Sequence, residues 1–192
     1  MGILDFWYCD VKTLLTRILL LTGAPGVGKT TVLVKTVDAL KAKGVSVGGM
    51  ISREVREGNM RVGFESLDLS SGKRGWLAHV NGQSGPQVGR YRVNLNDLDN
   101  IGTAAITKAL EKCSAVAIDE IGPMELYSQK FKQAVSEALE SKKLVVAVVH
   151  GKAKDPLVTQ VKRRVDAEIF NVTFSNREKL PEELTQKALQ AL

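Results

Sequence analysis

The stretch that decides the fold is GAPGVGKTT, at residues 23–31. Its first eight residues fit the pattern G-x-x-x-x-G-K-[ST]. Residues 17–22 (RILLLT) are an apolar run typical of a buried strand, and residues 30–42 place apolar side chains at helical spacing. A glycine-rich loop between a strand and a helix turns its backbone N–H groups toward a phosphate, and the helix dipole favours the negative charge. The sequence therefore predicts a phosphate-binding (Walker A) loop.

The residue types in this loop match the parts needed to hold a nucleoside triphosphate. Lys29 would bridge the β- and γ-phosphates and stabilise charge on them, and Thr30 would offer its hydroxyl to Mg²⁺. Lys29 is therefore both a binding and a catalytic candidate. The residues expected to contact the nucleotide are Gly23, Ala24, Pro25, Gly26, Val27, Gly28, Lys29, Thr30 and Thr31.

A second apolar run ends in two acids. Residues 115–119 (AVAID) predict a buried strand, and Glu120 follows directly. Ligands of an open α/β sheet bind outside the carboxyl ends of its strands. Asp119 is thus the candidate to hold Mg²⁺, as in a Walker B motif, and Glu120 the candidate to orient and deprotonate a water. Because side chains alternate along a strand, Glu120 is expected on the opposite face from Asp119.

Apolar runs alternate with segments of helical spacing along most of the chain. Strands are expected at 17–22, 45–55, 91–94, 115–119, 144–149 and 167–172, and helices at 30–42, 98–112, 124–141, 156–164 and 181–189. Turn clusters within 57–80 indicate an antiparallel β-meander inserted after the second strand. The pattern predicts an α/β fold with a doubly wound, mostly parallel sheet and that insertion. The Gly- and Ser-rich segment 81–89 is expected to be a flexible loop, which could act as a lid.

Composition narrows the class of protein. The 192 residues include 27 Lys and Arg against 21 Asp and Glu, a formal charge of +6 that suits phosphate-bearing ligands. The longest apolar runs, such as 144–149, are far shorter than the ~20 residues that cross a bilayer. Asp5 and Asp10 argue against a secretory signal. Cys9 and Cys113 are isolated, so neither a disulfide nor a zinc site is indicated. A cytoplasmic chain without membrane contact is expected.

Further segments carry a resemblance to a known family. They are REVR (53–56), RVGF (61–64), VGRY (88–91), DEIGPMEL (119–126) and FNVTFSNR (170–177). With the phosphate loop they resemble, over about residues 17–190, the small cytosolic nucleoside-triphosphatases that include a human cancer-related enzyme and archaeal and thermophilic-bacterial members. The resemblance implies a RecA-like sheet. It also implies Mg²⁺-dependent hydrolysis of ATP, GTP and other nucleoside triphosphates, with a catalytic Glu after the metal-binding Asp.

Two features depart from the family pattern. Family members usually begin a few residues before the first strand, so residues 1–16 are an extension of unknown role, and residues 17–192 form one nucleoside-triphosphatase domain. Relatives carry Arg-x-Arg near the last strand, where this chain has KRR at 162–164. Arg164 matches the second arginine. It is therefore the candidate to stabilise charge on the γ-phosphate in cis.

Other polar side chains have two interpretations. Each of these residues could either contact the nucleotide or have only a structural role. They are Arg53, Arg56, Arg61, Asn171, Thr173 and Asn176. The two histidines, His79 and His150, are expected to be incidental, because phosphoryl transfer with these motifs needs no imidazole.

Two alternative functions use the same motifs. A small-molecule or nucleotide kinase would close over a second substrate, with residues 81–89 and 162–164 as a lid. An NTP-switched, nucleic-acid-associated protein would use the positive charge, but no helix-turn-helix, zinc finger or aromatic-basic stripe is visible. Nucleic acid is therefore an unexpected partner. The leading prediction is a monomeric hydrolase of nucleoside triphosphates that uses water as the acceptor.

Overall fold

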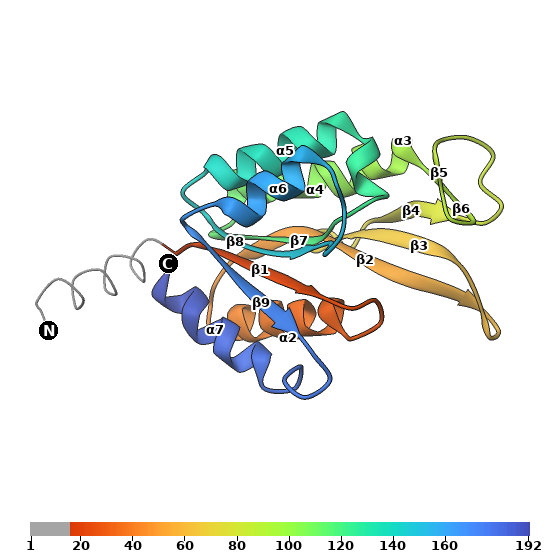
Figure 1. Ribbon diagram of the computed structural model, residues 1–192. Helices are drawn as coiled ribbons and strands as arrows, with labels where there is room; N and C mark the ends of the chain where they lie inside the picture. Colours follow the sequence, from red (N-terminus) through yellow and green to blue (C-terminus); the bar gives the residue numbers. More distant parts are fainter. Residues whose placement is uncertain (1–15) are drawn as a thin grey trace, which may run out of the picture.

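The computed structural model describes residues 16–192 and arranges them around one mixed sheet (Figure 1). Across residues 16–192 the strand order is β5-β6-β4-β3-β2-β7-β8-β1-β9. The expected extension at residues 1–16 lies, apart from Thr16, outside the described residues.

The half of the sheet that carries the predicted motifs is parallel. Its strands are β1 (Ile18–Gly23), β2 (Val47–Glu57), β7 (Ala115–Ile121), β8 (Leu144–Val149) and β9 (Ala167–Val172). Strand β8 lies between β7 and β1, and every residue of β8 is buried. A strand covered on both faces reads as a continuous apolar run, which is why LVVAVV shows no alternation. The prediction of a doubly wound, mostly parallel sheet is confirmed.

The other half of the sheet is the antiparallel insertion. It contains β3 (Met60–Asp68), β4 (Arg74–His79), β5 (Gln87–Val88) and β6 (Tyr91–Val93). Strand β2 joins the two halves, since its first residues pair with β7 and its later residues form a long hairpin with β3. The meander predicted from the turn clusters is confirmed. The end of the expected loop 81–89 pairs with β6 as the edge strand β5.

Helices cover both faces of the sheet (Figure 1). One face carries α2 (Lys29–Ala42) and α7 (Leu180–Gln190), and the other carries α4 (Ala104–Lys112), α5 (Gln129–Glu140) and α6 (Pro156–Arg163). The side chains of β1 alternate between the two resulting cores. Leu19 and Leu21 pack with α2 and α7, whereas Ile18 and Leu20 pack with the other helices. This double burial fixes the strand that leads into the phosphate loop.

Two helices start three or more residues away from the predicted position, and capping side chains explain both. The helix expected at 98–112 starts earlier, as α3 (Leu95–Asp97), because the Asn94 side chain accepts from the backbone N–H of Asp97 at 3.1 Å. It continues through a π-helical segment, Leu98–Thr103, into α4. The helix expected at 124–141 begins only at Gln129, because the hydroxyl of Ser128 accepts from Phe131 N–H. A short 3-10 turn, Glu125–Tyr127, precedes it.

Among the helices of residues 16–192, none has the length and apolar character needed to cross a membrane.

Candidate active site

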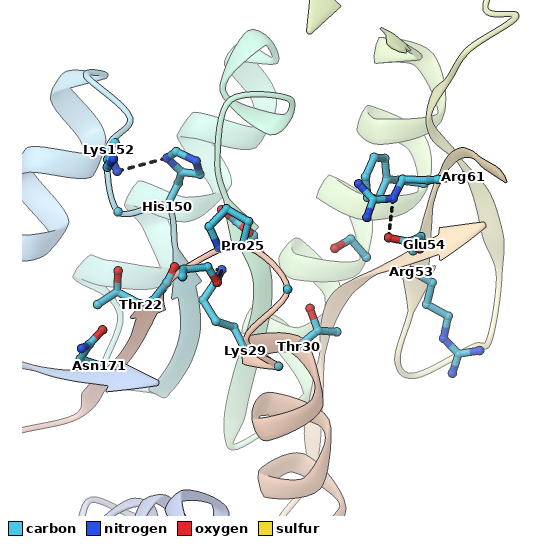
Figure 2. A pocket seen from close by; sticks show the side chains of 18 residues that line it. Thr22, Pro25, Lys29, Thr30, Arg53, Glu54, Arg61, His150, Lys152 and Asn171 are labelled. Carbon is cyan, nitrogen blue, oxygen red and sulfur yellow. Dashed lines mark hydrogen bonds and ion pairs between the residues drawn. The ribbon is translucent and has the colours of Figure 1, made fainter. Parts of the chain in front are cut away.

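A cavity of about 1090 Å³ lies at the carboxyl ends of the parallel strands (Figure 2). The predicted phosphate loop lines it. Glu120 from β7 and His150, which follows β8, line it beside the loop. Arg61 and Phe64, both on strand β3 of the antiparallel insertion, also line it. Both predicted motifs therefore meet in one site.

The loop adopts the conformation that a phosphate cradle needs. Gly26 and Gly28 have φ values of +74° and +105°, which side chains with a Cβ rarely adopt. The Lys29 ammonium donates to the carbonyl oxygens of Gly23 and Ala24 at 3.2 and 3.3 Å, so the lysine folds back over the loop. Val27 is one of the predicted contacts that does not line the cavity, because its side chain is buried in the core below the loop.

The remaining loop residues divide in the same way. Val27 and Thr31 do not line the cavity, whereas the other predicted contacts do. Those that line it are Gly23, Ala24, Pro25, Gly26, Gly28, Lys29 and Thr30. The Thr31 side chain is exposed on the first turn of α2. Val27 and Thr31 can therefore reach a phosphate only through their backbone N–H groups.

Asp119 lies below the loop and is 1% exposed. One of its carboxylate oxygens, Oδ2, accepts from the Ser52 hydroxyl at 3.2 Å, and the Thr30 hydroxyl is near enough to the carboxylate to lower its pKa. The other oxygen, Oδ1, is buried without a hydrogen-bond partner. Burial and, to a smaller extent, the neighbouring charge of Glu120 raise the pKa of Asp119 to about 6.

An orphaned carboxylate oxygen beside a threonine hydroxyl fits Mg²⁺. The ion prefers oxygen ligands and is usually held by one or two carboxylates together with substrate phosphates and water. Within residues 16–192, no group of three or more His, Cys, Asp and Glu side chains could hold an ion by itself. The residues present therefore suit an ion that arrives with the triphosphate, with Thr30 and Asp119 as its protein contacts.

Glu120, the residue after Asp119, lines the cavity. The pairing of β7 with β8 shifts register between Ile118 and Ile121, so the expected placement of Asp119 and Glu120 on opposite faces of the strand stays a prediction. The two carboxylates are close enough for the charge of one to raise the pKa of the other. Glu120 is thus exposed to the cavity while Asp119 is buried beneath it.

A third carboxyl group, that of Glu125, was missed by sequence reasoning. It is 4% exposed, and a methyl group built onto Gly122 would lie 3.0 Å from Glu120 Oε1 and 3.2 Å from Glu125 Oε2. Both side chains therefore approach Gly122. Burial raises the pKa of Glu125 to about 8, and the charges of Glu120 and Asp119 add to the effect. The sequence signal was a Glu within the DEIGPMEL segment, but nothing local indicated its burial.

The raised pKa of Glu125 predicts a pH-dependent stability. Because the folded-state pKa, about 8, lies above the ordinary value of 4.5, its contribution is full below pH 4.5 and is lost as pH rises through 8. Glu125→Gln keeps a neutral side chain and should remove this loss. The free energy of unfolding is measured in guanidinium chloride without Mg²⁺. The difference between Glu125→Gln and wild type should change in favour of the variant by on the order of 3 kcal/mol as pH rises from 5 to 8.

The control for that measurement is Glu111→Gln, at an exposed position on α4. This variant should follow the wild-type pH profile. Parallel profiles for Glu125→Gln and wild type would contradict the burial argument.

The structure does not bring Arg164 to the site. Its guanidinium makes a two-point pair with Asp166, with N···O distances of 2.9 and 3.1 Å, and also pairs with Glu140. The backbone carbonyl of Asp166 accepts from Ile18 N–H, at the start of β1, whereas the phosphate loop follows the end of β1. A six-residue strand separates the two places by roughly 16 Å. The strand direction therefore overturns the expectation that Arg164 stabilises the γ-phosphate.

We expect Arg164→Ala to leave turnover near the wild-type value and to lower the free energy of unfolding by about 1–3 kcal/mol, since it removes the two-point pair with Asp166 and leaves that carboxylate with Arg17, at 2.9 Å, as its charged partner. Chemical denaturation and steady-state turnover of the same preparation measure both effects. The exposed neighbour supplies the control, because Arg163→Ala should change stability by less than about 0.5 kcal/mol. A large loss of turnover with normal stability would restore Arg164 to the mechanism.

Lys162, unlike Arg164, contacts residues that line the cavity. Its ammonium donates to the carbonyl oxygens of His150 and Gly151 at 3.0 and 2.9 Å. Both of these residues line the cavity. Lys162 therefore fixes the backbone of the β8–α6 connection rather than reaching a phosphate itself.

The basic residues of the β2–β3 hairpin are only partly turned to the cavity. Arg61 pairs with Glu54 at 2.5 Å and lies over the ring of Phe64, 5.5 Å from its centroid. Arg53 points away from this pair (Figure 2). Arg56 also pairs with Glu54 at 2.5 Å. Arg61 is thus the member of the group best placed to face a bound ligand.

Asn171, Thr173 and Asn176, which could lie beside the nucleotide, mostly stabilise the turn at the end of β9. Thr173 N–H donates to the Asn176 side chain at 2.8 Å, and Asn176 Nδ2 donates to the carbonyl of Asn171 at 2.9 Å. Asn171 lines the cavity. The structural interpretation therefore holds for Thr173 and Asn176, while Asn171 remains beside the site.

With this geometry established, comparison with known proteins gives the family. A family model described as NTPase matches residues 18–185. This chain belongs to that NTPase family. It is 46% identical over 169 residues to nucleoside-triphosphatase THEP1 of Thermofilum pendens, covering 88% of this chain and 93% of the relative. It is 48% identical over 172 residues to the protein of the same name from Methanosarcina acetivorans, covering 89% and 96%.

Solved structures of NTPase-family proteins share the fold. The solution structure of a human cancer-related nucleoside triphosphatase is 37% identical with a TM-score of 0.76, and the match covers 89% of this chain and 96% of that one. The crystal structure of THEP1 from Aquifex aeolicus is 28% identical with the same TM-score of 0.76, covering 87% and 96%. The resemblance inferred from the motifs is confirmed at the level of family and fold.

Proposed function

We propose that this NTPase-family chain hydrolyses nucleoside triphosphates, ATP and GTP among them, to diphosphate and phosphate in the presence of Mg²⁺. One observation carries the proposal: the loop cation Lys29 and the acid Glu120 line one cavity, and the buried Asp119 accepts a hydrogen bond from Ser52, which lines the same cavity. The names of the relatives, nucleoside-triphosphatase THEP1, support the same activity.

Each group then has a separate role. The loop N–H groups and Lys29 would bind the β- and γ-phosphates, and the lysine would leave its present carbonyl partners to do so. Thr30 and Asp119 would hold Mg²⁺, which when bound neutralises charge on the phosphates. Glu120, open to the cavity, would orient a water and take its proton as the oxygen attacks the γ-phosphorus.

A kinase remains the alternative, but its expected lid has little support. Neither residues 81–89 nor Arg163 and Arg164 line the cavity. The deciding experiment is phosphate release from ATP, GTP, CTP and UTP without any added acceptor, with and without Mg²⁺. Steady release that requires Mg²⁺ supports hydrolysis by water. Activity that appears only with a nucleoside, sugar or nucleotide acceptor would replace the hydrolase proposal with a kinase.

The metal assignment predicts a specific loss for Asp119→Asn. Removing one charge from the ion's position should raise the Mg²⁺ concentration for half-maximal turnover by about 10- to 100-fold. Titration of Mg²⁺ at saturating ATP measures this change. Nucleotide binding in EDTA provides the control, since it should hardly change. An unaltered Mg²⁺ titration would show that Asp119 does not hold the ion.

Three expectations have no structural test and stay predictions. They are a cytoplasmic location, a monomeric state and activity that does not depend on nucleic acid.

A further inference from the structure

His150 occupies a position that the motifs did not single out. It directly follows β8, and β8 lies between β7, which ends in Asp119 and Glu120, and β1, which ends in the phosphate loop. The side chain lines the same cavity as Lys29 and Glu120. A group at the end of the middle strand lies between the two predicted motifs, beside the space that the γ-phosphoryl would occupy.

The surroundings of His150 define which ring atom is free. Its Nδ1 accepts from the backbone N–H of Lys152 at 3.3 Å, so in the neutral ring the proton is on Nε2. Figure 2 shows the Lys152 contact on one side of the His150 ring, and His150 lines the cavity. The free Nε2–H donor is therefore on the cavity side.

The backbone that carries this ring is also fixed. Lys162 binds the carbonyls of His150 and Gly151, as described above, and His150 N–H donates to the carbonyl of Ile121 at 3.1 Å. The second contact ties the end of β8 to the end of β7. A donor that is held in place before the ligand arrives loses little entropy when it binds.

We propose that His150 Nε2–H donates a hydrogen bond to the γ-phosphoryl oxygens, so that the site distinguishes nucleoside triphosphate from diphosphate. The proposal rests on the proposed function, because it assumes phosphates in the loop with the γ end toward Glu120. The ring stays neutral, and no proton leaves it. Its contribution grows as negative charge accumulates on the transferring group, which makes His150 a catalytic residue in addition to Glu120.

The other histidine supplies a matched control. His79 Nδ1 accepts from the backbone N–H of Asn81 at 3.0 Å, the same two-residue spacing that His150 has with Lys152. Its ring packs against Trp76, with centroids 4.5 Å apart, and His79 is not among the residues that line the cavity. The two residues therefore share a tautomer but differ in access to the ligand.

The first test is NMR of the wild-type full-length chain, whose two histidines give a simple spectrum. Long-range ¹H–¹⁵N spectra should show Nε2–H tautomers for both. Addition of Mg²⁺ with a non-hydrolysable ATP analogue should shift the Nε2 signal of His150 clearly more than Mg²⁺ with ADP does. The His79 signal should stay in place. Equal shifts of the His150 signal with both nucleotides, or none, would overturn the proposal.

The second test compares affinities in His150→Ala and His150→Gln. We expect His150→Ala to bind the non-hydrolysable ATP analogue about 10-fold more weakly while binding ADP as wild type does, since hydrogen bonds to charged groups are worth this much or more. His150→Gln, whose amide keeps an N–H donor, should regain part of the lost affinity for the ATP analogue. Turnover of His150→Ala should fall by at least the same factor as its affinity. The control His79→Ala should keep the wild-type affinity ratio. A variant that loses both nucleotides equally would make His150 structural.

This comparison also separates His150 from the proposed catalytic base. If Glu120→Gln hydrolysed ATP normally, the role of Glu120 would fail. The ratio of affinities for the two nucleotides in the His150 variants would still be a direct measure of its contact with the γ-phosphate.

Discussion

Glu120→Gln should lower the rate of ATP hydrolysis by about 10²- to 10⁴-fold while binding of Mg²⁺ with ATP is retained. The amide keeps the size of the side chain and most of its hydrogen bonds but cannot take a proton from water. Lys29, Thr30 and Asp119, which would hold the nucleotide and ion, are unchanged. Single-turnover phosphate release and isothermal titration with a non-hydrolysable analogue measure the two quantities separately.

The matched control is Glu111→Gln on the exposed face of α4, which should hydrolyse at the wild-type rate. Wild-type turnover in Glu120→Gln would make the carboxylate a mere strand-end residue and favour the kinase alternative. Loss of binding together with turnover would assign Glu120 to the metal site, and our division of roles between the two acids would be wrong.

Lys29→Ala should weaken binding of Mg²⁺ with ATP by about 10²-fold or more, because removing a charged partner of a buried phosphate costs roughly 2–5 kcal/mol. The fold should survive, since the ammonium contacts only the carbonyls of its own loop in the free protein. Ligand that binds only the folded state raises the melting temperature. Saturating nucleotide should therefore stabilise wild type and have little effect on Lys29→Ala.

The same helix offers a control in Lys35→Ala. Lys35 pairs with Glu178 on the surface, with side-chain exposures of 49% and 67%. This variant should keep the wild-type affinity and the full thermal shift. If Lys29→Ala also kept its affinity, the loop would not be the phosphate site.

The features that sequence reasoning predicted correctly are those with local causes. The run at 17–22 leads into GAPGVGKT, and the glycines, the lysine and the helix start all lie within one short stretch whose backbone geometry sets their function. The apolar run that ends at Asp119 and Glu120 is likewise a local signal. Strand and helix types followed from hydrophobic spacing and turn residues, and their boundaries moved by more than two residues only where Asn94 and Ser128 cap a helix.

Contacts between segments distant in the sequence could be identified only from the tertiary structure, because they depend on strand order and direction. Arg164 precedes a strand of the functional sheet, but at its amino end, so its charge is used by Asp166 at the edge opposite the phosphate loop. Glu125 reads as an ordinary surface acid, yet a turn after β7 buries it against Glu120. His150 lies beside the phosphate loop because strand β8 lies between β7 and β1 in the sheet. Hydrophobic spacing along the sequence does not determine this strand order.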